Sequence, residues 1–396
     1  MQLASRLLRF QEPETLKMAR LGREMRAQGI DVVDLSLGEP DFDTPQHIKD
    51  AAKKAIDENW SHYTPVSGFL ELREAICYKF KRDNELTYSP ENIIVSTGAK
   101  QSLANAVLSI VDEGDEVIIP TPFWVSYAAM VQLGKGKVKL LRTTTKTRYK
   151  ITAEQLEAAI TSKTKLFIFS SPCNPSGAVY REEELQELAE VFKRNPQVFI
   201  VSDEIYEYIN YCSCHATLAG HDELKERTVV VNGLSKGFAM TGWRLGYLAA
   251  SKEIAKACEK LQGQFTSGTN SITQRAAITA LTLPLNATND MVNEFERRKN
   301  RVVELMKDIE GLEFVEPDGA FYVFPSVNSF FGKRYNGETI KTADDLCMYL
   351  LNTAHVSTVT GSAFGDDQCI RISFANNMRN IEKGFERIAD ALNNLS

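Results

Sequence analysis

The chain has no long apolar run, no basic excess and no cysteine framework, and each absence excludes a class of protein. No stretch approaches the roughly eighteen consecutive apolar residues of a membrane span. The first thirty residues hold short apolar runs broken by charges, unlike a secretory leader. A formal net charge of −6 argues against nucleic acid, and seven scattered cysteines, an odd number, fit a reducing compartment. We therefore expect a cytoplasmic protein that binds small molecules, not membranes or nucleic acids.

One local cluster, formed by Cys212, Cys214 and His215, has the residue types of a metal site. It lacks the second pair of ligands that zinc spacing requires. We interpret the cysteines as ordinary loop thiols and expect no metal.

Short apolar runs alternate with helical stretches from about residue 90 onward. Runs of this kind fit strands that are covered by helices on both faces, as in an α/β protein with a mostly parallel sheet. The predicted strands are 93–97, 116–120, 166–170, 198–203 and 228–233. The run at 244–250 follows too closely for a helical crossover, so we expect one antiparallel strand there.

The sequence pattern changes after residue 285, where long charged helices precede a short strand pair around GAFYVFP, the run IRISF and a terminal helix. At 396 residues the chain is long enough for two domains. We expect a large domain over 47–285 and a smaller α+β domain over 286–396. An N-terminal arm, 1–46, should pack back on the smaller domain.

Small, aromatic and amide residues follow the first three predicted strands. Ala99 and Lys100 open a helix, where backbone N–H groups can bind an anion. Trp124 offers a flat ring, and Asn174 lies in a loop that two prolines restrain. Each feature alone also fits an ordinary turn or a core aromatic. Because ligands bind beyond the carboxyl ends of such strands, we expect these residues to converge.

Charged residues follow the next two strands. Asp203 comes directly after apolar strand residues, where a carboxylate is costly without a cationic partner. Tyr206 faces the same way if the chain turns helical there. Ser235 and Lys236 lie in the tight connection before the antiparallel strand, and Arg244 follows. Pyridoxal 5′-phosphate needs a lysine for a Schiff base, an acid for its ring nitrogen, and hydroxyls, N–H groups and an arginine for its phosphate.

The segment GLSKGFAMTGWRLG, 233–246, resembles the lysine signature of the class I (fold type I) aminotransferases. SLGEPDFDTP, HYTPVSG, STGAKQ, SPCNPSG, SDEIY and IRISFA resemble the same family in the same order, from about Ile30 to Ala389. The nearest branch is the bacterial aspartate aminotransferases. The resemblance implies a homodimer that moves an amino group between L-aspartate and 2-oxoglutarate by a ping-pong aldimine mechanism.

The resemblance also implies how the cofactor is held. Lys236 would form the Schiff base and shuttle a proton, and Asp203 would keep the ring nitrogen protonated. Trp124 would stack on the ring, while Tyr206 and Asn174 would bond to its 3-oxygen. The phosphate would be bound by Ala99, Lys100, Ser235 and Arg244, and by Tyr63 from the other subunit.

Substrate recognition follows from the same resemblance. Gly38 and Arg371 would bind the α-carboxylate, beside Trp124 and Asn174. Strand alternation places Arg371 opposite Ile370 and Ile372, so that its guanidinium can grip a carboxylate.

The sequence departs from the family in places that affect the choice of substrate. The segment 262–268 has no arginine for a side-chain carboxylate, a role that would fall to Lys100. Gly233 replaces a phosphate-binding serine of some relatives and leaves Ser235 as the nearby hydroxyl. The chain also reads Gln11-Glu12-Pro13-Glu14-Thr15 where the branch usually has Pro-Ser-Ala-Thr. An acid that pointed into a dicarboxylate site would oppose binding of aspartate.

Other functions remain open at this stage. An aromatic or prephenate aminotransferase fits the same motifs, and a lyase or synthase fits the same scaffold. Residues 233–237 also match G-x-S-x-G, with Ser235, Asp318 and His355 in the chain order of a serine hydrolase, but that motif must open into a helix. Regulators with an aminotransferase-like domain need a DNA-binding segment ahead of it, and here the resemblance begins at about Ile30.

Overall fold

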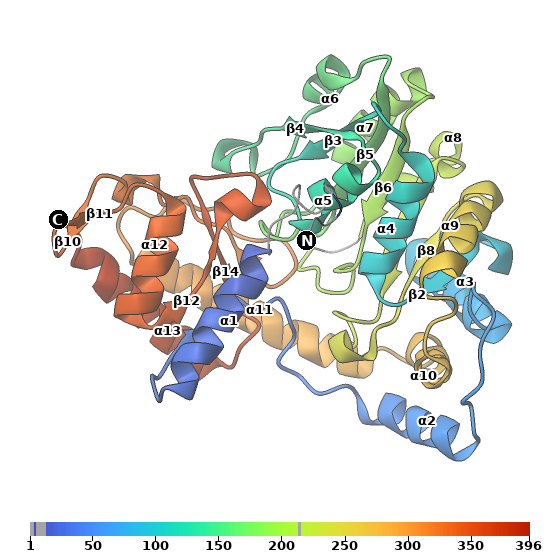
Figure 1. Cartoon of the computed structure of the whole chain (residues 1–396), viewed down its shortest axis with the longest axis horizontal. Coiled ribbons are helices and arrows are strands. Elements are labelled where there is room, and N and C mark those ends of the chain that lie inside the picture. Colours follow the sequence, from blue (N-terminus) through green and yellow to red (C-terminus); the bar gives the residue numbers. More distant parts are fainter. Residues whose placement is uncertain (1–3, 5–12, 213–214) are drawn as a thin grey trace.

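A computed structural model describes residues 4, 13–212 and 215–396. Gln11, Glu12 and Cys214, which the sequence analysis singled out, lie outside the described residues. The elements between about residues 46 and 285 form and surround one large sheet. The later elements form a smaller group beside it, together with the blue N-terminal helix (Figure 1).

The large sheet has seven strands in the order β2-β8-β7-β6-β5-β3-β4. Its strands are β2 (Ile93–Ser96), β3 (Glu116–Pro120), β4 (Lys137–Leu141), β5 (Thr164–Ser170), β6 (Phe199–Asp203), β7 (Thr228–Gly233) and β8 (Gly246–Ala249). β8 pairs antiparallel with both β2 and β7, while the other pairs are parallel. The expected α/β class and its one antiparallel strand are confirmed.

The edge strand β4 was not expected from the sequence. It alternates Lys137 and Lys139 with apolar residues, and its side chains are half-buried or exposed. Lysines on an edge strand discourage pairing with another chain. They also remove the continuous apolar run by which the inner strands were recognised.

Helices cover both faces of the sheet. They are α2 (Gln46–Asp57), α3 (Leu70–Asn84), α4 (Ala99–Ile110), α5 (Ser126–Leu133), α6 (Ala153–Ala159), α7 (Glu182–Arg194), α8 (Asp222–Lys225), α9 (Lys252–Phe265) and α10 (Ser271–Thr282). Alternate strand residues face opposite layers: Val117 and Ile119 of β3 pack in the cluster that contains residues of α4, α5 and α9, whereas Ile118 packs with residues of α6 and α7. This burial on two faces explains the continuous apolar runs.

The smaller group combines the N-terminal segment with the C-terminal third of the chain. Its elements are α1 (Glu14–Ala27), β1 (Val33–Asp34), α11 (Asn286–Lys307), β9 (Tyr322–Val323), β10 (Arg334–Tyr335), β11 (Glu338–Thr339), α12 (Ala343–Tyr349), β12 (Val356–Ser357), β13 (Val359–Thr360), β14 (Ile370–Ser373) and α13 (Met378–Asn393). β1 pairs in parallel with β12, which fastens the N-terminal segment to this group. A strand pair was expected around GAFYVFP. The structure instead has the single strand β9 there, paired with β14.

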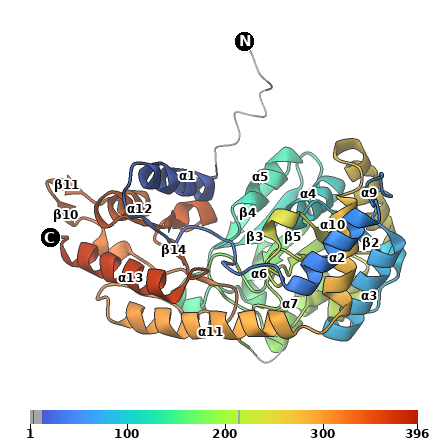
Figure 2. The ribbon, with the colours of Figure 1, turned by 90° about the horizontal axis from the view of Figure 1, so that it is seen from below.

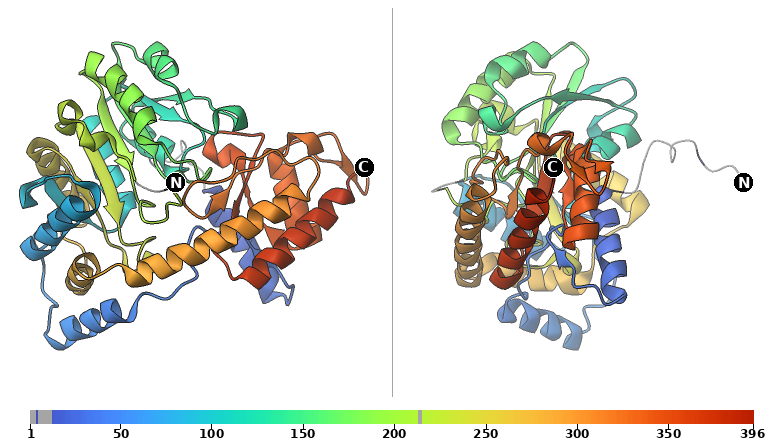
Figure 3. Two further views of the ribbon diagram at one scale, coloured as in Figure 1. Left: turned by 180° about the vertical axis from the view of Figure 1, so that it is seen from behind. Right: turned by 90° about the vertical axis from the view of Figure 1, so that its left-hand side faces the viewer.

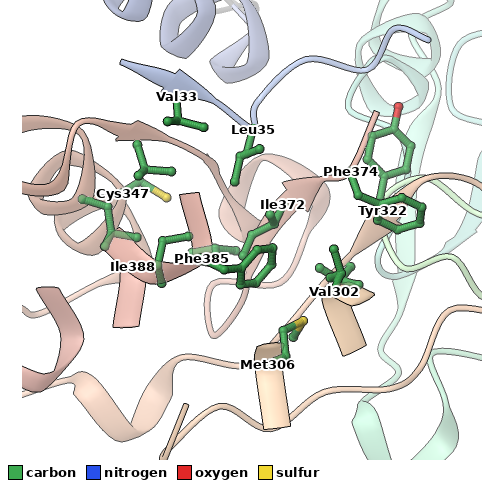
Figure 4. Close-up of a cluster of buried hydrophobic side chains, with 14 of the residues drawn as sticks. Val33, Leu35, Val302, Met306, Tyr322, Cys347, Ile372, Phe374, Phe385 and Ile388 are labelled. Carbon is green, nitrogen blue, oxygen red and sulfur yellow. The ribbon is translucent and has the colours of Figure 1, made fainter. Parts of the chain in front are cut away.

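The core of this group gathers side chains from distant parts of the sequence, including Leu35, Met306, Ile372 and Phe385 (Figure 4). The long helix α11 runs along the molecule from the sheet to this group (Figure 2, Figure 3). Within the described residues, no helix combines the length and the apolar character that crossing a membrane requires.

Candidate active site

A cavity of about 390 Å³ lies where the carboxyl ends of the strands face the smaller group of elements. It brings together residues that are far apart in the sequence. Of the expected site residues, it is lined by Gly38, Ala99, Lys100, Trp124, Asn174, Asp203, Tyr206, Ser235, Lys236, Arg244 and Arg371. Tyr63 is the one expected site residue that does not line this cavity; all of the expected site residues lie in the described part of the chain.

Lys236 lies in the turn between β7 and β8. Its Nζ donates to the carbonyl of Gly38 and lies 5.7 Å from the ring centre of Tyr206. Burial lowers the pKa of Lys236 to about 8, and the charges of Arg371 and Arg244 act in the same direction. The lowered pKa leaves more of this amine uncharged at neutral pH than in an ordinary lysine, and the uncharged amine is the form that attacks a carbonyl.

Asp203 is the last residue of β6 and is 4% exposed. Tyr127 donates its hydroxyl to Oδ2 over 2.6 Å, and the Ile205 N–H lies 3.3 Å from Oδ1. Burial raises the pKa of this carboxyl to about 6, against the effect of the Tyr127 hydrogen bond. Among the described residues no cation is paired with it. A protonated ring nitrogen would supply that missing partner.

Tyr206 reaches the same cavity through a turn, not through the helical continuation that the sequence analysis considered. The Glu207 N–H bonds to the carbonyl of Glu204 over 2.9 Å and closes this turn. The Tyr206 hydroxyl lies 2.7 Å from that of Tyr322. Its phenol oxygen is thus held at the cavity wall, where it can bond to a ligand oxygen.

The N-terminus of α4 forms an anion-binding corner with Arg244. Gly98, which precedes the helix, has φ +85°, and a Cβ there would come within 2.5 Å of Arg244 Nη2. Glycine is therefore required both by the backbone and by the close approach of the guanidinium. Ser235 adds a hydroxyl nearby on the cavity wall. Free N–H groups, a helix dipole, a hydroxyl and an arginine together fit a phosphate.

Arg371 is buried on β14, with 2% of its surface exposed. Its Nη1 donates to Asn174 Oδ1 over 3.0 Å, its Nη2 donates to the Ser36 carbonyl, and its Nε has no partner among the residues that the structure describes. Burial lowers the pKa of this guanidinium. Within the described part of the chain it makes no ion pair, so a buried charge faces the cavity without a counter-ion. A carboxylate ligand would supply one.

Trp124 and Lys100 form another part of the wall. The Trp124 ring meets Tyr127 edge to face at 5.5 Å, and Lys100 Nζ lies 5.0 Å from the Trp124 ring centre. Burial and the charge of Arg244 lower the pKa of Lys100. Lys100 is thus placed near Arg244, at the side of the cavity that α4 forms.

Tyr63 is fully exposed and does not reach this cavity. It lines a separate hollow formed by residues 61–64 and 268–271. From this hollow the Tyr63 side chain does not contact the cavity that contains Lys236, so any ligand that it binds lies outside that cavity.

Several cavity residues were missed by the sequence analysis. Tyr127 follows Trp124 by three residues, a helical spacing that could have identified it. Tyr322 lies in the quoted GAFYVFP run. Helix α1 contributes a face consisting of Thr15, Leu16, Ala19 and Arg23.

Glu14 does not line the cavity, contrary to the concern raised by its sequence position. Its carboxylate pairs with Lys17 at 3.2 Å, one turn along α1. The acid next to Thr15 therefore adds no carboxylate to the described lining of the cavity.

The serine hydrolase alternative is wrong. After Ser235 the chain forms a turn, one short 3₁₀ helix (Thr241–Trp243) and then β8, and not the α-helix that the motif requires. Asp318 pairs with Arg148 at 3.1 Å, and His355 contacts the Leu351 carbonyl. Neither of these two residues lines the cavity that contains Ser235.

Cys212 and His215 of the cysteine and histidine cluster make hydrogen bonds to other parts of the protein. His215 Nε2 bonds to buried Glu204 at 2.9 Å, and Cys212 Sγ contacts the Asp318 carbonyl. Glu204, Glu207 and His215 lie close enough to bind a cation. However, Lys79 is already paired with Glu207, and the charge of Glu204 raises the pKa of His215. Lys79 thus already balances Glu207, and Glu204 already has His215 as a hydrogen-bond partner.

The chain resembles known proteins over its whole length. The family described as "Aminotransferase class I and II" matches residues 30–388. An aspartate aminotransferase of Rhizobium meliloti (strain 1021) is 43% identical over 398 residues, which cover 100% of this chain and 97% of the relative. A Petunia hybrida protein, named bifunctional aspartate aminotransferase and glutamate/aspartate-prephenate aminotransferase, is 45% identical over 371 residues, or 92% of this chain and 77% of the relative.

Solved structures show the same similarity. The crystal structure of the Rhizobium meliloti aspartate aminotransferase has a TM-score of 0.96 at 43% identity and covers 100% of both chains. The Thermus thermophilus aspartate aminotransferase, solved with maleate, has a TM-score of 0.92 at 37% identity and covers 99% of this chain and 100% of that one.

Proposed function

Because the chain belongs to the class I and II aminotransferases, we propose that it uses pyridoxal 5′-phosphate to exchange an amino group between L-aspartate and 2-oxoglutarate. The observation that carries this proposal is the convergence of Lys236, Asp203 and Arg371 on one cavity. The names of the Rhizobium meliloti and Petunia hybrida relatives support aspartate as donor.

The residues present fit the cofactor. Asp203 lacks a cationic partner among the described residues and would hold the proton of the ring nitrogen. Trp124 would stack on the ring, with Tyr206 and Asn174 at its 3-oxygen. Arg244, Ser235 and the backbone at Ala99 and Lys100 would hold the phosphate.

When bound, the cofactor supplies an aldehyde for the lysine and a ring that withdraws electrons from the substrate's α-carbon. Arg371 would fix the α-carboxylate, and the carbonyl of Gly38 would orient the Lys236 amine. Lys236 Nζ would then accept the proton of the α-carbon and later return one. The lowered pKa of Lys236, about 8, suits this exchange because proton transfer is most efficient near the working pH.

We propose a homodimer in which Tyr63 completes the phosphate site of the partner. Its full exposure and its distance from the cavity of its own chain support this role. We also propose a large domain over 47–285, a smaller domain over 286–396 and an N-terminal arm over 1–46, in a cytoplasmic enzyme.

The kinetic test of this function is the order of substrate binding. A single cavity that serves both half-reactions predicts ping-pong kinetics. Double-reciprocal plots with aspartate varied at several fixed concentrations of 2-oxoglutarate should then give parallel lines. Intersecting lines, which indicate a ternary complex, would contradict the proposal.

Replacing Lys100 by Met tests recognition of the side-chain carboxylate. Removal of this cation should raise the KM for aspartate and glutamate more than that for phenylalanine, by roughly 3- to 30-fold if a charged hydrogen bond is lost. Steady-state kinetics with the three donors measure the effect. An equal loss for all three would leave Lys100 with a phosphate role alone.

An aromatic amino donor, or prephenate as the amino acceptor, is the second candidate. The Petunia hybrida name includes prephenate, and apolar Leu16 and Trp124 line the cavity here. Turnover of phenylalanine well above that of aspartate, or of prephenate well above that of 2-oxoglutarate, would favour this candidate.

A further inference from the structure

The cavity contains more cationic groups than the proposed chemistry has used. Its described lining has five basic side chains against one acid, Asp203. Arg244 is assigned to the phosphate, Lys236 to the covalent bond and Arg371 to the α-carboxylate, and Lys100 has been assigned to a side-chain carboxylate. The fifth basic residue, Arg23, has no role so far.

Arg23 projects from the face of α1 that lines the cavity. Thr15, Ala19 and Arg23 are spaced four residues apart, so they lie along one face of the helix. Leu16 extends the same surface. Arg23 therefore belongs to the cavity wall by helical geometry, on an element of the smaller group of the fold.

The neighbouring basic residues of α1 pair with described acids, whereas Arg23 pairs with none of the described residues. Lys17 pairs with Glu14, Arg20 with Glu24, and Arg26 with Asp34. Arg23 is exposed and makes no hydrogen bond or ion pair with another described residue. Its five N–H donors, in a planar fork that suits a carboxylate, remain available to a ligand.

Lys100 and Arg23 enter the cavity from different walls. Lys100 stands at the start of α4, near Arg244 and over Trp124, which is the cofactor side. Arg23 comes from α1, which belongs to the smaller group of elements. A carboxylate carried on a short side chain would meet Lys100, whereas a longer side chain can extend toward α1.

We propose that Arg23 is a specificity-determining residue that binds the distal carboxylate of dicarboxylic substrates longer than aspartate. This inference rests on the proposed aminotransferase function and deepens it. The substrates concerned are amino and 2-oxo acids whose second carboxylate is separated from the α-carbon by two or more carbons. Because Arg23 is exposed, its contribution is that of a solvent-screened charged pair.

The experiment compares Arg23→Leu and Arg23→Lys with the wild type in the cofactor-loaded protein. Inhibition constants of succinate, glutarate and adipate measure binding without chemistry, and kcat/KM is measured for aspartate, glutamate, 2-aminoadipate and phenylalanine. Arg20→Leu is the matched control, since it removes the same charge from α1 at a residue that does not line the cavity.

For Arg23→Leu we expect binding of adipate and kcat/KM for 2-aminoadipate to fall about 3- to 5-fold, mainly through KM. Glutarate and glutamate should show a smaller loss, and succinate, aspartate and phenylalanine less than about twofold. Arg23→Lys should recover part of the loss because it restores the charge but not the fork. Arg20→Leu should match the wild type.

An equal change for every ligand, including phenylalanine, would overturn the inference and make Arg23 a structural residue of α1. No change for the long dicarboxylates would overturn it as well. In both cases the proposed function would stand if the wild type still transaminates aspartate. A wild-type protein that turns over no dicarboxylic donor would refute the proposed function and this inference together.

Discussion

Lys236→Ala should abolish covalent capture of pyridoxal 5′-phosphate and reduce transamination by at least about 100- to 10,000-fold. This whole range represents the loss of the proton shuttle alone, since it is the typical contribution of a general acid or base. Loss of covalent attachment adds to it. The structure supports so large an effect because Lys236 is the lysine on the tight connection between β7 and β8, and burial lowers its pKa to about 8. Reduction with borohydride followed by peptide mapping measures the attachment, and steady-state kinetics measure the turnover.

Two variants serve as controls for this result. Ser235→Ala removes the adjacent hydroxyl and should retain attachment, with a weaker hold on the phosphate. Lys100→Met removes a different amine from the same cavity and should also retain attachment. Near wild-type turnover by Lys236→Ala would refute the assignment.

Asp203→Ala should weaken cofactor binding and slow removal of the α-proton. Loss of one partner from a buried charge pair costs roughly 3–5 kcal/mol, equivalent to about a hundredfold to a few thousandfold. Titration of cofactor-free protein with pyridoxal 5′-phosphate measures the first effect, and single-turnover kinetics the second. Tyr127→Phe is a graded control, since it removes one hydrogen bond to the same carboxylate. Unchanged binding and rate in Asp203→Ala would mean that this carboxylate does not hold the ring nitrogen.

The stability of the cofactor-free protein separates this role from a structural one. The pKa of Asp203 in the folded protein, about 6, lies above its usual value of 3.8. Ionisation of this group therefore disfavours the folded state, increasingly from pH 4 to pH 6 and fully above that range. Cofactor-free Asp203→Asn should unfold at a higher temperature than cofactor-free wild type at pH 7.5, and the difference should shrink toward pH 4. A less stable variant at pH 7.5 would indicate that Asp203 supports the fold itself.

The inner strands of the sheet could be predicted because burial on two faces leaves a continuous apolar signal. The β3 segment 116–120 and the β7 segment 228–233 were predicted with the bounds that the structure has. Edge strand β4 left no such signal, since Lys137 and Lys139 alternate with apolar residues. The GAFYVFP run predicts a local strand pair, whereas its strand β9 pairs with β14, which lies far along the chain. Pairing between distant segments cannot be read from local patterns.

The site residues that lie at or just after the carboxyl ends of strands could be predicted, because these ends meet at one edge of the sheet. Lys236 and Asn174 follow strands β7 and β5, Asp203 is the last residue of β6, and the structure places all three on one cavity. Backbone partners were not predictable, such as the carbonyls of Gly38 and Ser36 that accept from Lys236 and Arg371. The position of Arg23 at the cavity was not predictable either, because the placement of α1 depends on the pairing of β1 with β12, a strand far along the chain. These contacts depend on tertiary packing.

The most direct test of the central claim is the near-ultraviolet and visible absorption spectrum of the purified protein, before and after aspartate, glutamate or phenylalanine is added singly. We expect an absorption band of lysine-bound pyridoxal 5′-phosphate, which aspartate and glutamate convert to the spectrum of the amine form more readily than phenylalanine does. A protein that shows no such band, even after incubation with pyridoxal 5′-phosphate, would contradict the assignment of Lys236 and of the cavity around it.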